Sequence, residues 1–442
     1  MDRVPELYKE YSDYKNKCSM FPSMVDGLLP VQRRILLTLH TIARGSFVKT
    51  SKVVGENMAR FHPHSPAEGT CAWAVQNGFA DGEGSWGTDI GKNEIPPASM
   101  RYTKIKSSTV FEEIALKYIK SVKFEESEVD PEPKNFPTMV PLCFIAKKYF
   151  SYIGSGFRTD IPCYEISDVI KRLKYLLNLE KVEPIISPRF KNCKVTSKKK
   201  ELKSLLNTGM GTIELEGLYS ENEEKKCVYI HGWPPDIKFE ALYNRINRYN
   251  DIYFFDNGLV GCIDESTKKN GTKIRLEVLK SRNTADIYNN LLDAVKSSLT
   301  GKITFRTNVV DPDDNMRIAT VDEMLLTAYE NYKKYFTIHH ENLVKYYENI
   351  VDEYDLINKI KAHLSADVLN KKYDVVIKFL SDKTGVSTKD IENVLEKYKI
   401  KKLMTVNYDK KEMLDRIATV KKILKNKESV IISEYDEILK KV

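Results

Sequence analysis

The chain has 442 residues, too many for one hydrophobic core, so its length predicts two to four domains. Its 70 basic and 62 acidic residues leave a net charge of +8, which suits a polyanionic partner but is also common in proteins that bind none. Seven scattered cysteines without a C-x-x-C pair indicate neither a disulfide framework nor a zinc ribbon. There is neither a secretion signal nor an apolar run of membrane-spanning length, so a cytoplasmic location without membrane contact is expected.

The part of the chain from about residue 23 to residue 120 mixes short helical patterns with Gly-rich turns, which is typical of a compact helix-turn-helix-like domain. A helix is predicted over 30–43, because Pro30 suits a first helical turn and apolar residues follow at helical spacing. The segment 78–97 contains five glycines and two prolines, which predicts loops without regular structure.

The middle of the chain, from about 166 to 312, has a mixed α/β pattern that predicts a separate domain. Strand-like stretches separated by turn residues carry this prediction, and they lie at 212–217, 226–232 and 273–279.

Two long helical stripes follow. The first runs from Val321 to Leu364 with an expected interruption near His339, and the second runs from Met413 to Val442. The stripes can pair as an antiparallel coiled coil with the segment 365–409 as a small knob at its far end. Periodicity alone allows equally for two ordinary amphipathic helices on a globular core.

Four motifs lie between residues 24 and 105 in a fixed order. They are MVDGLLPVQRRIL (24–36), FHPHSPAEG (61–69), SWG (85–87) and PPASMRYTKI (96–105). In this order and spacing they resemble the DGLKPVxRR, YHPHG, GNFG and AAxRYTE motifs of the type IIA DNA topoisomerase cleavage subunits, those of the gyrase A and topoisomerase IV A type. The segments 136–170 and 211–220 resemble further regions of that family.

The resemblance implies a multidomain α+β fold. Residues 1–165 would form a winged-helix DNA cleavage domain, residues 166–312 an α/β tower domain, and residues 313–442 a long antiparallel coiled coil with a small helical dimerisation gate. The implied activity is transient cleavage of both strands of duplex DNA through 5′-phosphotyrosyl links, followed by strand passage and religation.

Tyr102 is the expected nucleophile by this resemblance. A phosphotyrosyl link retains the energy of the broken bond for rejoining, so one hard step becomes two transesterifications. A free Tyr titrates near ~10 and needs positive charge or a base nearby at neutral pH. Arg101 matches the family arginine that contacts the scissile phosphate, which a guanidinium suits.

His62 and His64 match the histidine pair of the family, which is expected to contact phosphates or relay protons near the tyrosine. Loop histidines satisfied by backbone groups remain the alternative. A zinc site is not expected, because no third and fourth ligand stands at usable spacing.

Arg33 and Arg34 are expected to contact the DNA backbone from an early helix, or else to form a solvated basic face. Val140 stands where the family places an isoleucine that wedges between base pairs. An apolar β-branched side chain can unstack a base step, and core packing is the alternative role.

The chain departs from the family at several places. Ser19 stands where the family carries a catalytic arginine, and Lys15 and Lys17 are candidates to substitute for it. The acidic Mg²⁺ segment and the ATPase motif of the family are not found, and the acidic run 311–314 is predicted to be a turn. Mg²⁺ ligands and ATP binding are therefore expected mainly on a partner.

The expected assembly on duplex DNA is an A2B2 heterotetramer, in which a homodimer of this chain joins a partner that carries the ATPase and the metal ligands. A free-standing cleavage subunit is the simplest interpretation, and a piece of a longer single-chain enzyme is the alternative. The divergence favours a large phage or DNA virus over a typical bacterium, with the bacterial or infected-host cytoplasm as the location.

Two other functions compete with this one. A tyrosine recombinase would place its nucleophile near the C-terminus, whereas some 340 residues follow Tyr102. A non-enzymatic DNA-bending protein derived from the family is the second alternative, favoured by the missing arginine.

Overall fold

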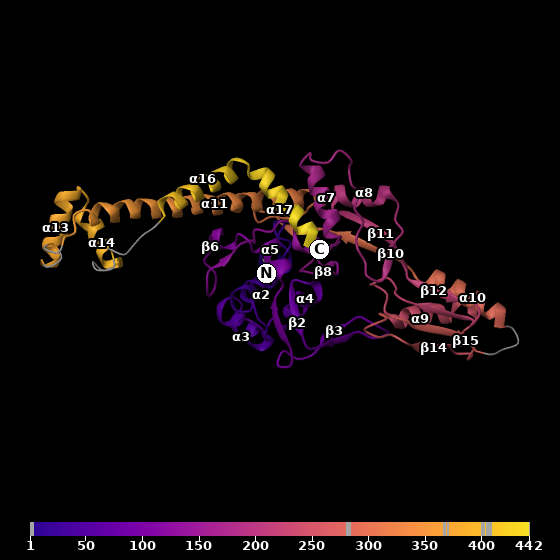
Figure 1. Cartoon of the computed structure of the whole chain (residues 1–442). Helices are drawn as coiled ribbons and strands as arrows, with labels where there is room; N and C mark the ends of the chain where they lie inside the picture. Colours follow the sequence, from indigo (N-terminus) through magenta and orange to yellow (C-terminus); the bar gives the residue numbers. More distant parts are fainter. Residues whose placement is uncertain are drawn as a thin grey trace. The chain divides into compact units, whose positions relative to one another are not determined.

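The computed structural model describes residues 4–279, 284–365, 371–398 and 409–441, together with positions 368 and 403. By its contacts the chain forms two compact units: unit 1 is Met1–Tyr332 with Tyr435–Val442, and unit 2 is Lys333–Glu434. The strands that the structure describes belong to unit 1, and helices occur in both (Figure 1). This mixture of helices and several small sheets is compatible with a multidomain α+β protein, while the division at residues 165 and 312 stays a prediction.

The N-terminal part of unit 1 combines helices with an antiparallel sheet of strand order β1-β5-β2. Its elements are α1 (Val4–Lys15), η1 (Asn16–Met20), α2 (Pro30–Ile42), β1 (Val48–Lys49), α3 (Thr50–Arg60), α4 (Glu68–Asn77), β2 (Ala80–Glu83), β3 (Trp86–Thr88), β4 (Ile95–Pro97), β5 (Lys104–Ser107), α5 (Thr109–Ala115) and η2 (Ile119–Ser121). Helices α2, α3 and α4 pack against one another, and α2 and α4 also contact the sheet. Helix α2 starts at Pro30, so the helix predicted there is confirmed.

The prediction that 78–97 lacks regular structure is wrong for part of the segment. Strand β2 pairs with β5, and β3 pairs with β4. These strands are only three or four residues long, so glycines can supply the turns between them without interrupting a ladder. Gly84, Gly87 and Gly91 adopt φ values of 97°, 81° and 90°, which glycine reaches without steric cost.

The rest of unit 1 is built on two larger sheets, with strand orders β10-β11-β16-β9-β8 and β12-β13-β15-β14. Its elements are β6 (Phe124–Glu125), β7 (Glu132–Pro133), α6 (Leu142–Ile145), β8 (Phe150–Ile153), β9 (Arg158–Ile161), α7 (Ile166–Leu176), β10 (Cys193–Val195), α8 (Lys199–Thr208), β11 (Met210–Gly217), β12 (Tyr219–Asn222), β13 (Cys227–Ile230), α9 (Phe239–Asn247), η3 (Tyr249–Asp251), β14 (Val260–Asp264), β15 (Ile274–Val278), α10 (Thr284–Ser298), β16 (Thr300–Arg306), β17 (Asn308–Val310) and β18 (Met316–Ile318). Strands β11, β13 and β15 confirm the three predicted strands.

Each of the two sheets has its own core. Alternate residues of β15, Ile274, Leu276 and Val278, are buried with Leu242 of α9 and Leu291 of α10. In the five-stranded sheet, apolar residues of β11 and β16 pack with α8.

The acidic run 311–314 is a turn, as predicted, because Oδ1 of Asp311 accepts the amides of residues 313 and 315.

Helix α11 (Val321–Lys361) is continuous, so the interruption expected near His339 is wrong. The Nδ1 atom of His340 lies 2.8 Å from the carbonyl oxygen of Phe336. This polar side chain is therefore satisfied four residues back within the same helix, and it does not break the backbone ladder.

Unit 2 contains antiparallel helices. Helix α16 (Lys410–Lys425) packs on α11 through Val344, Ile417 and Val420, and the ion pairs Glu348–Lys421 and Asp355–Lys410 show the opposed directions. Helices α13 (Tyr373–Thr384) and α14 (Thr388–Tyr398) share a core with the end of α11. The C-terminal stripe divides at Asn426 into α16 and α17 (Lys427–Lys441). Val442, the predicted end of that stripe, lies outside the described residues.

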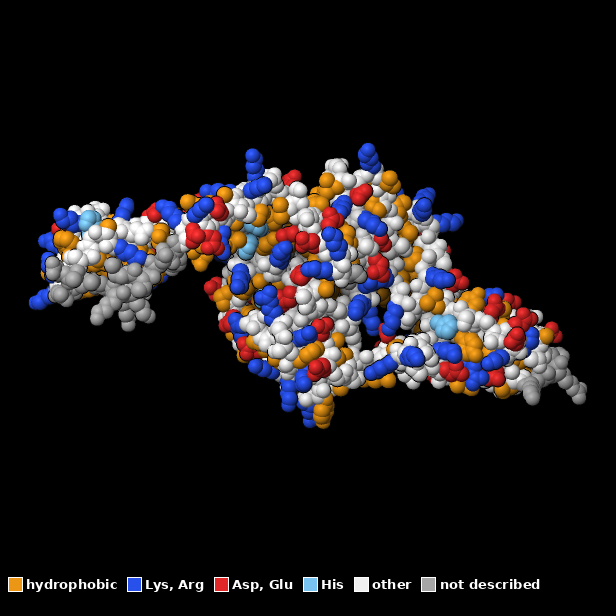
Figure 2. Space-filling model, viewed as in Figure 1, with side chains coloured by type: hydrophobic (Ala, Val, Ile, Leu, Met, Phe, Trp, Pro, Cys, Tyr) orange, Lys and Arg blue, Asp and Glu red, His pale blue; other side chains and the backbone are white. Residues whose placement is uncertain are grey.

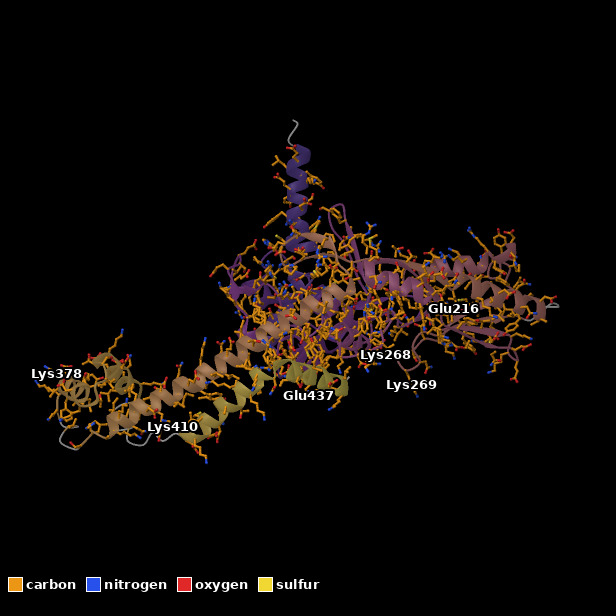
Figure 3. The ribbon with its side chains drawn as sticks, turned by 90° about the horizontal axis from the view of Figure 1, so that it is seen from above. Glu216, Lys268, Lys269, Lys378, Lys410 and Glu437 are labelled. Atoms are coloured by element: carbon orange, nitrogen blue, oxygen red, sulfur yellow. The ribbon has the colours of Figure 1, made fainter. Side chains whose placement is uncertain are left out.

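Two surface features of unit 1 are relevant to binding. On the face shown in Figure 2, Lys and Arg side chains are interspersed with Asp and Glu and form no continuous basic stripe. Helix α1 projects from the rest of unit 1 and is the indigo helix at the top of Figure 3. Leu7, Tyr11 and Tyr14 are each more than half exposed on it, at a spacing that places them on one helical face.

Candidate functional site

Tyr102 lies on a turn between β4 and β5, with its amide donating to the Ser99 carbonyl at 2.9 Å. Its side chain is 68% exposed. The guanidinium carbon of Arg101 lies 4.9 Å from the centroid of the Tyr102 ring. The structure therefore presents a solvent-accessible phenol beside a permanent positive charge, which is the combination that the sequence predicted.

The turn that carries Tyr102 is fixed on both sides. The hydroxyls of Thr103 and Thr50 are 2.8 Å apart, and the Thr50 amide donates to the Thr103 carbonyl at 3.1 Å. On the other side, the Met100 amide donates to Oε1 of Glu68 at 2.5 Å. Helices α3 and α4 thus hold the backbone on either side of an exposed side chain.

A second group of candidate residues gathers around Arg34. Its Nε and Nη2 atoms donate to the two carboxylate oxygens of Glu132 at 2.8 and 2.6 Å, a bidentate pair. Its Nη1 atom lies 3.1 Å from Nδ1 of His62. The hydrogen bond to Glu132 raises the pKa of Arg34.

The contact with Arg34 determines the protonation of His62. A guanidinium can only donate, so Nδ1 of His62 must accept, and the ring proton of the neutral imidazole is on Nε2. Burial, followed by the charges of Arg34 and His64, lowers the pKa of His62 below its ordinary value. His62 is therefore a neutral hydrogen-bond donor through Nε2 at neutral pH.

His64 and its neighbours form contacts that the sequence patterns did not predict. Nε2 of His64 lies 2.8 Å from a carboxylate oxygen of Glu128, and Nε of Arg60 donates to Asp130 at 2.8 Å. Together with Glu132, these acids belong to the β6–β7 hairpin, here defined as residues 123–134. The five acidic residues in that segment were the available signal, but the partners of these three acids lie 64 to 98 positions away along the chain.

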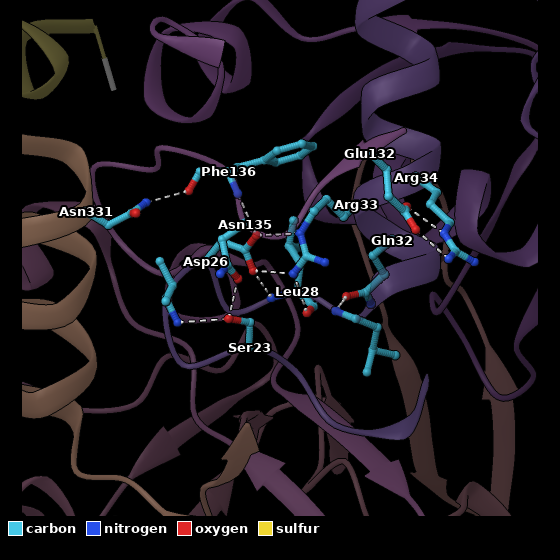
Figure 4. A network of polar contacts seen from close by, with 12 residues as sticks. Ser23, Asp26, Leu28, Gln32, Arg33, Arg34, Glu132, Asn135, Phe136 and Asn331 are labelled. Carbon is cyan, nitrogen blue, oxygen red and sulfur yellow. Dashed lines mark hydrogen bonds and ion pairs between the residues drawn. The ribbon is translucent and has the colours of Figure 1, made fainter. Parts of the chain in front are cut away.

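Arg33 faces the interior, unlike Arg34 (Figure 4). Its Nε and Nη2 atoms donate to the two oxygens of Asp26 at 2.7 and 2.9 Å, and its side chain is 8% exposed. The same carboxylate accepts the amides of Leu28 and Phe136. Burial therefore keeps Arg33 away from any phosphate at the surface in this structure, and its geometry is that of a structural ion pair.

Val140 is 1% exposed and lies among other buried residues, including Met139 and Leu142. In this structure the side chain has the placement of the core-packing alternative. Before it could enter a base step, the segment around Pro141 would have to move and expose it.

A cavity of about 620 Å³ borders the second group of residues. It is lined by Arg34, His62, Tyr152 and the segment Cys18–Met20, among others. Ser19, where the family carries an arginine, is therefore on the wall of this cavity, whereas Lys15 and Lys17 are not. Among the described residues no hydrogen bond, ion pair or ring contact joins Tyr102 to Arg34 or to either histidine, so the structure forms two separate groups.

The described part of the chain does not fit a metal centre of its own. Within it, no three His, Cys, Asp or Glu side chains lie close enough together to hold a metal ion. In the same ranges, no helix is long and apolar enough to cross a bilayer.

Comparison with known proteins identifies the family to which the chain belongs. The family model described as DNA gyrase/topoisomerase IV, for the A subunit, matches residues 20–441. The A subunit of DNA topoisomerase 4 from Streptococcus pyogenes serotype M6 is 30% identical over an alignment of 317 residues, and the match covers 66% of this chain and 37% of that protein. The A subunit of DNA gyrase from Thermotoga maritima is 28% identical, covering 66% and 38%, and the A subunit of DNA topoisomerase 4 from Bacillus subtilis is 25% identical, covering 75% and 42%.

The chain belongs to the family of DNA gyrase and topoisomerase IV A subunits, which confirms the resemblance found in the motifs. It is thus a type IIA A-subunit-like protein. The matched part of the chain spans 37–42% of the length of these three relatives.

Asp26→Ala should lower the free energy of unfolding by about 3–5 kcal/mol, because Arg33 would remain buried without its carboxylate. Glu128→Ala, which removes an exposed pair with His64, should cost less than ~1 kcal/mol. Urea denaturation followed by tryptophan fluorescence measures both. An Asp26→Ala chain as stable as Glu128→Ala would contradict the structural role of the ion pair.

His62 should appear at pH 7 as the neutral Nε2–H tautomer and titrate below the ordinary His value near ~6.5, as ¹⁵N NMR of labelled histidine can determine. Since the unfolded state binds the proton more tightly, the stability contributed by His62 is complete above that value and is lost as the pH falls toward the lowered pKa. A His62→Gln chain identifies the His62 signal among the seven histidines by its loss, and a proton on Nδ1 would refute the assignment.

Proposed function

We propose that this chain is the DNA-cleaving and rejoining subunit of a type IIA DNA topoisomerase and that Tyr102 is its nucleophile. The observation that carries the proposal is the exposed phenol beside Arg101, on a turn fixed by α3 and α4, in a chain of this family. The exposure of Tyr102 leaves its phenol accessible to a DNA phosphate.

The proposed reaction is a reversible transesterification. The Tyr102 oxygen attacks a backbone phosphorus, a bond from tyrosine oxygen to the 5′-phosphate forms, and the 3′-oxygen leaves as a hydroxyl after taking a proton. Arg101 neutralises the charge that develops on the phosphate oxygens. The reverse attack by the 3′-hydroxyl restores the phosphodiester and frees the phenol, so no external energy is consumed by cleavage and rejoining.

The Arg34 group is proposed to bind phosphate near the break. His62 offers a proton from Nε2 to a phosphate oxygen, and Arg34 holds the ring in that tautomer. Because Nε2 already carries a proton, His62 acts as a donor in this proposal, and the phenolic proton passes to solvent. His64 and Arg34 can bind phosphate once it replaces the carboxylates of Glu128 and Glu132.

The family also suggests the larger architecture. In this proposal α2, α3, α4 and the β1-β5-β2 sheet form a winged helix, the two larger sheets form the tower, and α11 with α16 forms the coiled coil leading to a dimerisation gate at α13 and α14. Two chains, each with one Tyr102, would cut the two strands, and a second duplex would pass through before religation.

A partner chain is proposed to hold the Mg²⁺ ligands and the ATP site, giving an A2B2 heterotetramer that acts in the bacterial or infected-host cytoplasm. The relatives are named as A subunits, which supports the need for a second kind of subunit. The exposed stripe of Leu7, Tyr11 and Tyr14 on α1 is apolar surface that such a partner could cover.

The second candidate function is a non-enzymatic DNA-bending protein derived from the family. The observation in its favour is Ser19, which occupies the wall of the Arg34 cavity where the family has a catalytic arginine. This candidate keeps the DNA contacts of Arg34 and His64 but assigns no chemistry to Tyr102, so the two functions differ in whether a covalent link forms.

Tyr102→Phe should reduce covalent protein–DNA complexes by roughly 10³-fold or more, because it removes the attacking oxygen while leaving the ring in place. The test mixes the chain with its ATPase partner, Mg²⁺, ATP and supercoiled plasmid, then adds detergent and protease. Linear DNA with a 5′-phosphotyrosyl peptide is the expected product of the wild type.

Tyr346→Phe is the matched control, because Tyr346 is also exposed, at 59%, but lies on α11 in unit 2. It should cleave as the wild type does. Intact circles with the wild type, together with bending of a bound duplex, would favour the DNA-bending protein instead. Equal cleavage by wild type and Tyr102→Phe would remove Tyr102 from the mechanism.

A further inference from the structure

Strands β3 and β4 form a two-stranded arm, here defined as Trp86–Pro97, and Figure 1 shows β3 reaching toward β14. At its tip the Gly91 amide donates to Oγ1 of Thr272 at 3.2 Å, and the Lys92 amide donates to Oδ2 of Asp264 at 3.0 Å. These four residues are called the clasp. Its two halves are more than 170 positions apart in the sequence, and it ties the arm to the β12-β13-β15-β14 sheet.

The clasp is sterically specific. A Cβ atom on Gly91 would lie 3.0 Å from Oδ2 of Asp264, and the φ of Gly91 is +90°, so glycine alone fits there. Thr272 is buried, which strengthens the demand that its hydroxyl and the Gly91 amide remain paired. Nζ of Lys92 also donates to the Cys262 carbonyl at 3.3 Å, next to the ring of Phe239.

The other end of the arm leads directly into the Tyr102 turn. The Ala98 amide donates to the Ser85 carbonyl at 2.9 Å and closes the arm, and Tyr102 follows four residues later. Gly84 lies just before the arm, and a Cβ atom added to it would lie 3.1 Å from the Tyr102 carbonyl oxygen. The base of the arm and the tyrosine backbone are therefore in contact.

Between its ends the arm borders open space. A cavity of about 820 Å³ separates it from the rest of unit 1 and is lined by residues 89 and 91–94 of the arm and by Trp233 and Phe239 on the opposite side, among others. Asp89 pairs with Lys191 at 3.1 Å and Lys148 at 3.5 Å, but both lysines are more than half exposed and such pairs are weak. The clasp, in which the Gly91–Thr272 hydrogen bond is buried, is thus the firmer attachment.

We propose that Asp264 and Thr272 are positioning residues for Tyr102. The clasp holds the tip of the two paired strands against the four-stranded sheet. The strands in turn fix the position of residues 98–102. The phenol then has a defined direction although most of its own side chain is exposed to solvent. This inference rests on the proposed function, since positioning has a catalytic consequence only if Tyr102 attacks DNA.

Thr272→Val tests the proposal, because it removes the acceptor of the Gly91 amide while keeping the shape of the side chain. In the free chain, hydrogen exchange at the Gly91 and Tyr102 amides should accelerate about 5-fold, as expected for loss of one hydrogen bond. In the assembled enzyme, the covalent-complex yield should fall about 5-fold, while the dissociation constant for duplex DNA is unchanged.

Thr272→Ser should restore both the exchange and the cleavage, because it keeps the hydroxyl. Lys268→Ala is the control in the same loop, since Lys268 lies between β14 and β15 and its position is labelled in Figure 3. It should leave both unchanged. Unaltered exchange at Tyr102 in Thr272→Val would overturn the inference, and so would faster exchange with normal cleavage.

A failure of the proposed function gives a different pattern. In that case the wild type forms no covalent complex, and the assignment of a catalytic positioning role falls with it. The hydrogen-exchange comparison would then still show whether the clasp orders the Tyr102 turn, so the two failures are distinguishable.

Discussion

The buried ion pair of Asp26 and Arg33 is the constraint on which the candidate site depends. One carboxylate accepts two guanidinium hydrogen bonds and the amides of Leu28 and Phe136, so it joins the loop before α2, the helix itself and the segment after β7. Successive helical residues point about 100° apart. When Arg33 faces inward, Arg34 is directed toward Glu132 and His62, so the group that is proposed to bind phosphate is oriented by a buried ion pair.

Basic side chains of the candidate site are paired with nearby carboxylates, so the amino-acid composition of the chain does not reveal the site. Arg34, Arg60 and His64 are each engaged by an acid of the β6–β7 hairpin, so Arg34 and His64, which are proposed to bind DNA, already have acidic partners in the free chain. The net charge of the chain is +8, and on the face shown in Figure 2 basic side chains are interspersed with acidic ones. Both observations are consistent with the pairing of opposite charges. A polyanion would have to compete with carboxylates for the same donors, which makes the interaction sensitive to ionic strength.

The sequence predicted what short-range patterns determine. Helix α2, strands β11, β13 and β15 and the turn at Asp311 were predicted because periodicity and turn residues are local. The inward direction of Arg33 and the burial of Val140 depend on contacts with residues from distant parts of the chain. The positions of Arg33 and Val140 within their motifs therefore could not predict this burial. The Arg34–Glu132 pair spans 98 positions, and the short strands of the arm are stabilised by a partner strand and a distant clasp.

The return of the chain to unit 1 has an evolutionary consequence. Tyr332, where the chain leaves unit 1, and Tyr435, where it re-enters, have ring centroids 6.1 Å apart, and the Tyr435 hydroxyl donates to the Met139 carbonyl at 2.5 Å. Unit 2 is thus an insertion whose two ends are neighbours. Segments joined at adjacent points can be lengthened, shortened or exchanged between homologues without rethreading the host core. A change in the length of unit 2 can therefore leave the core of unit 1 undisturbed.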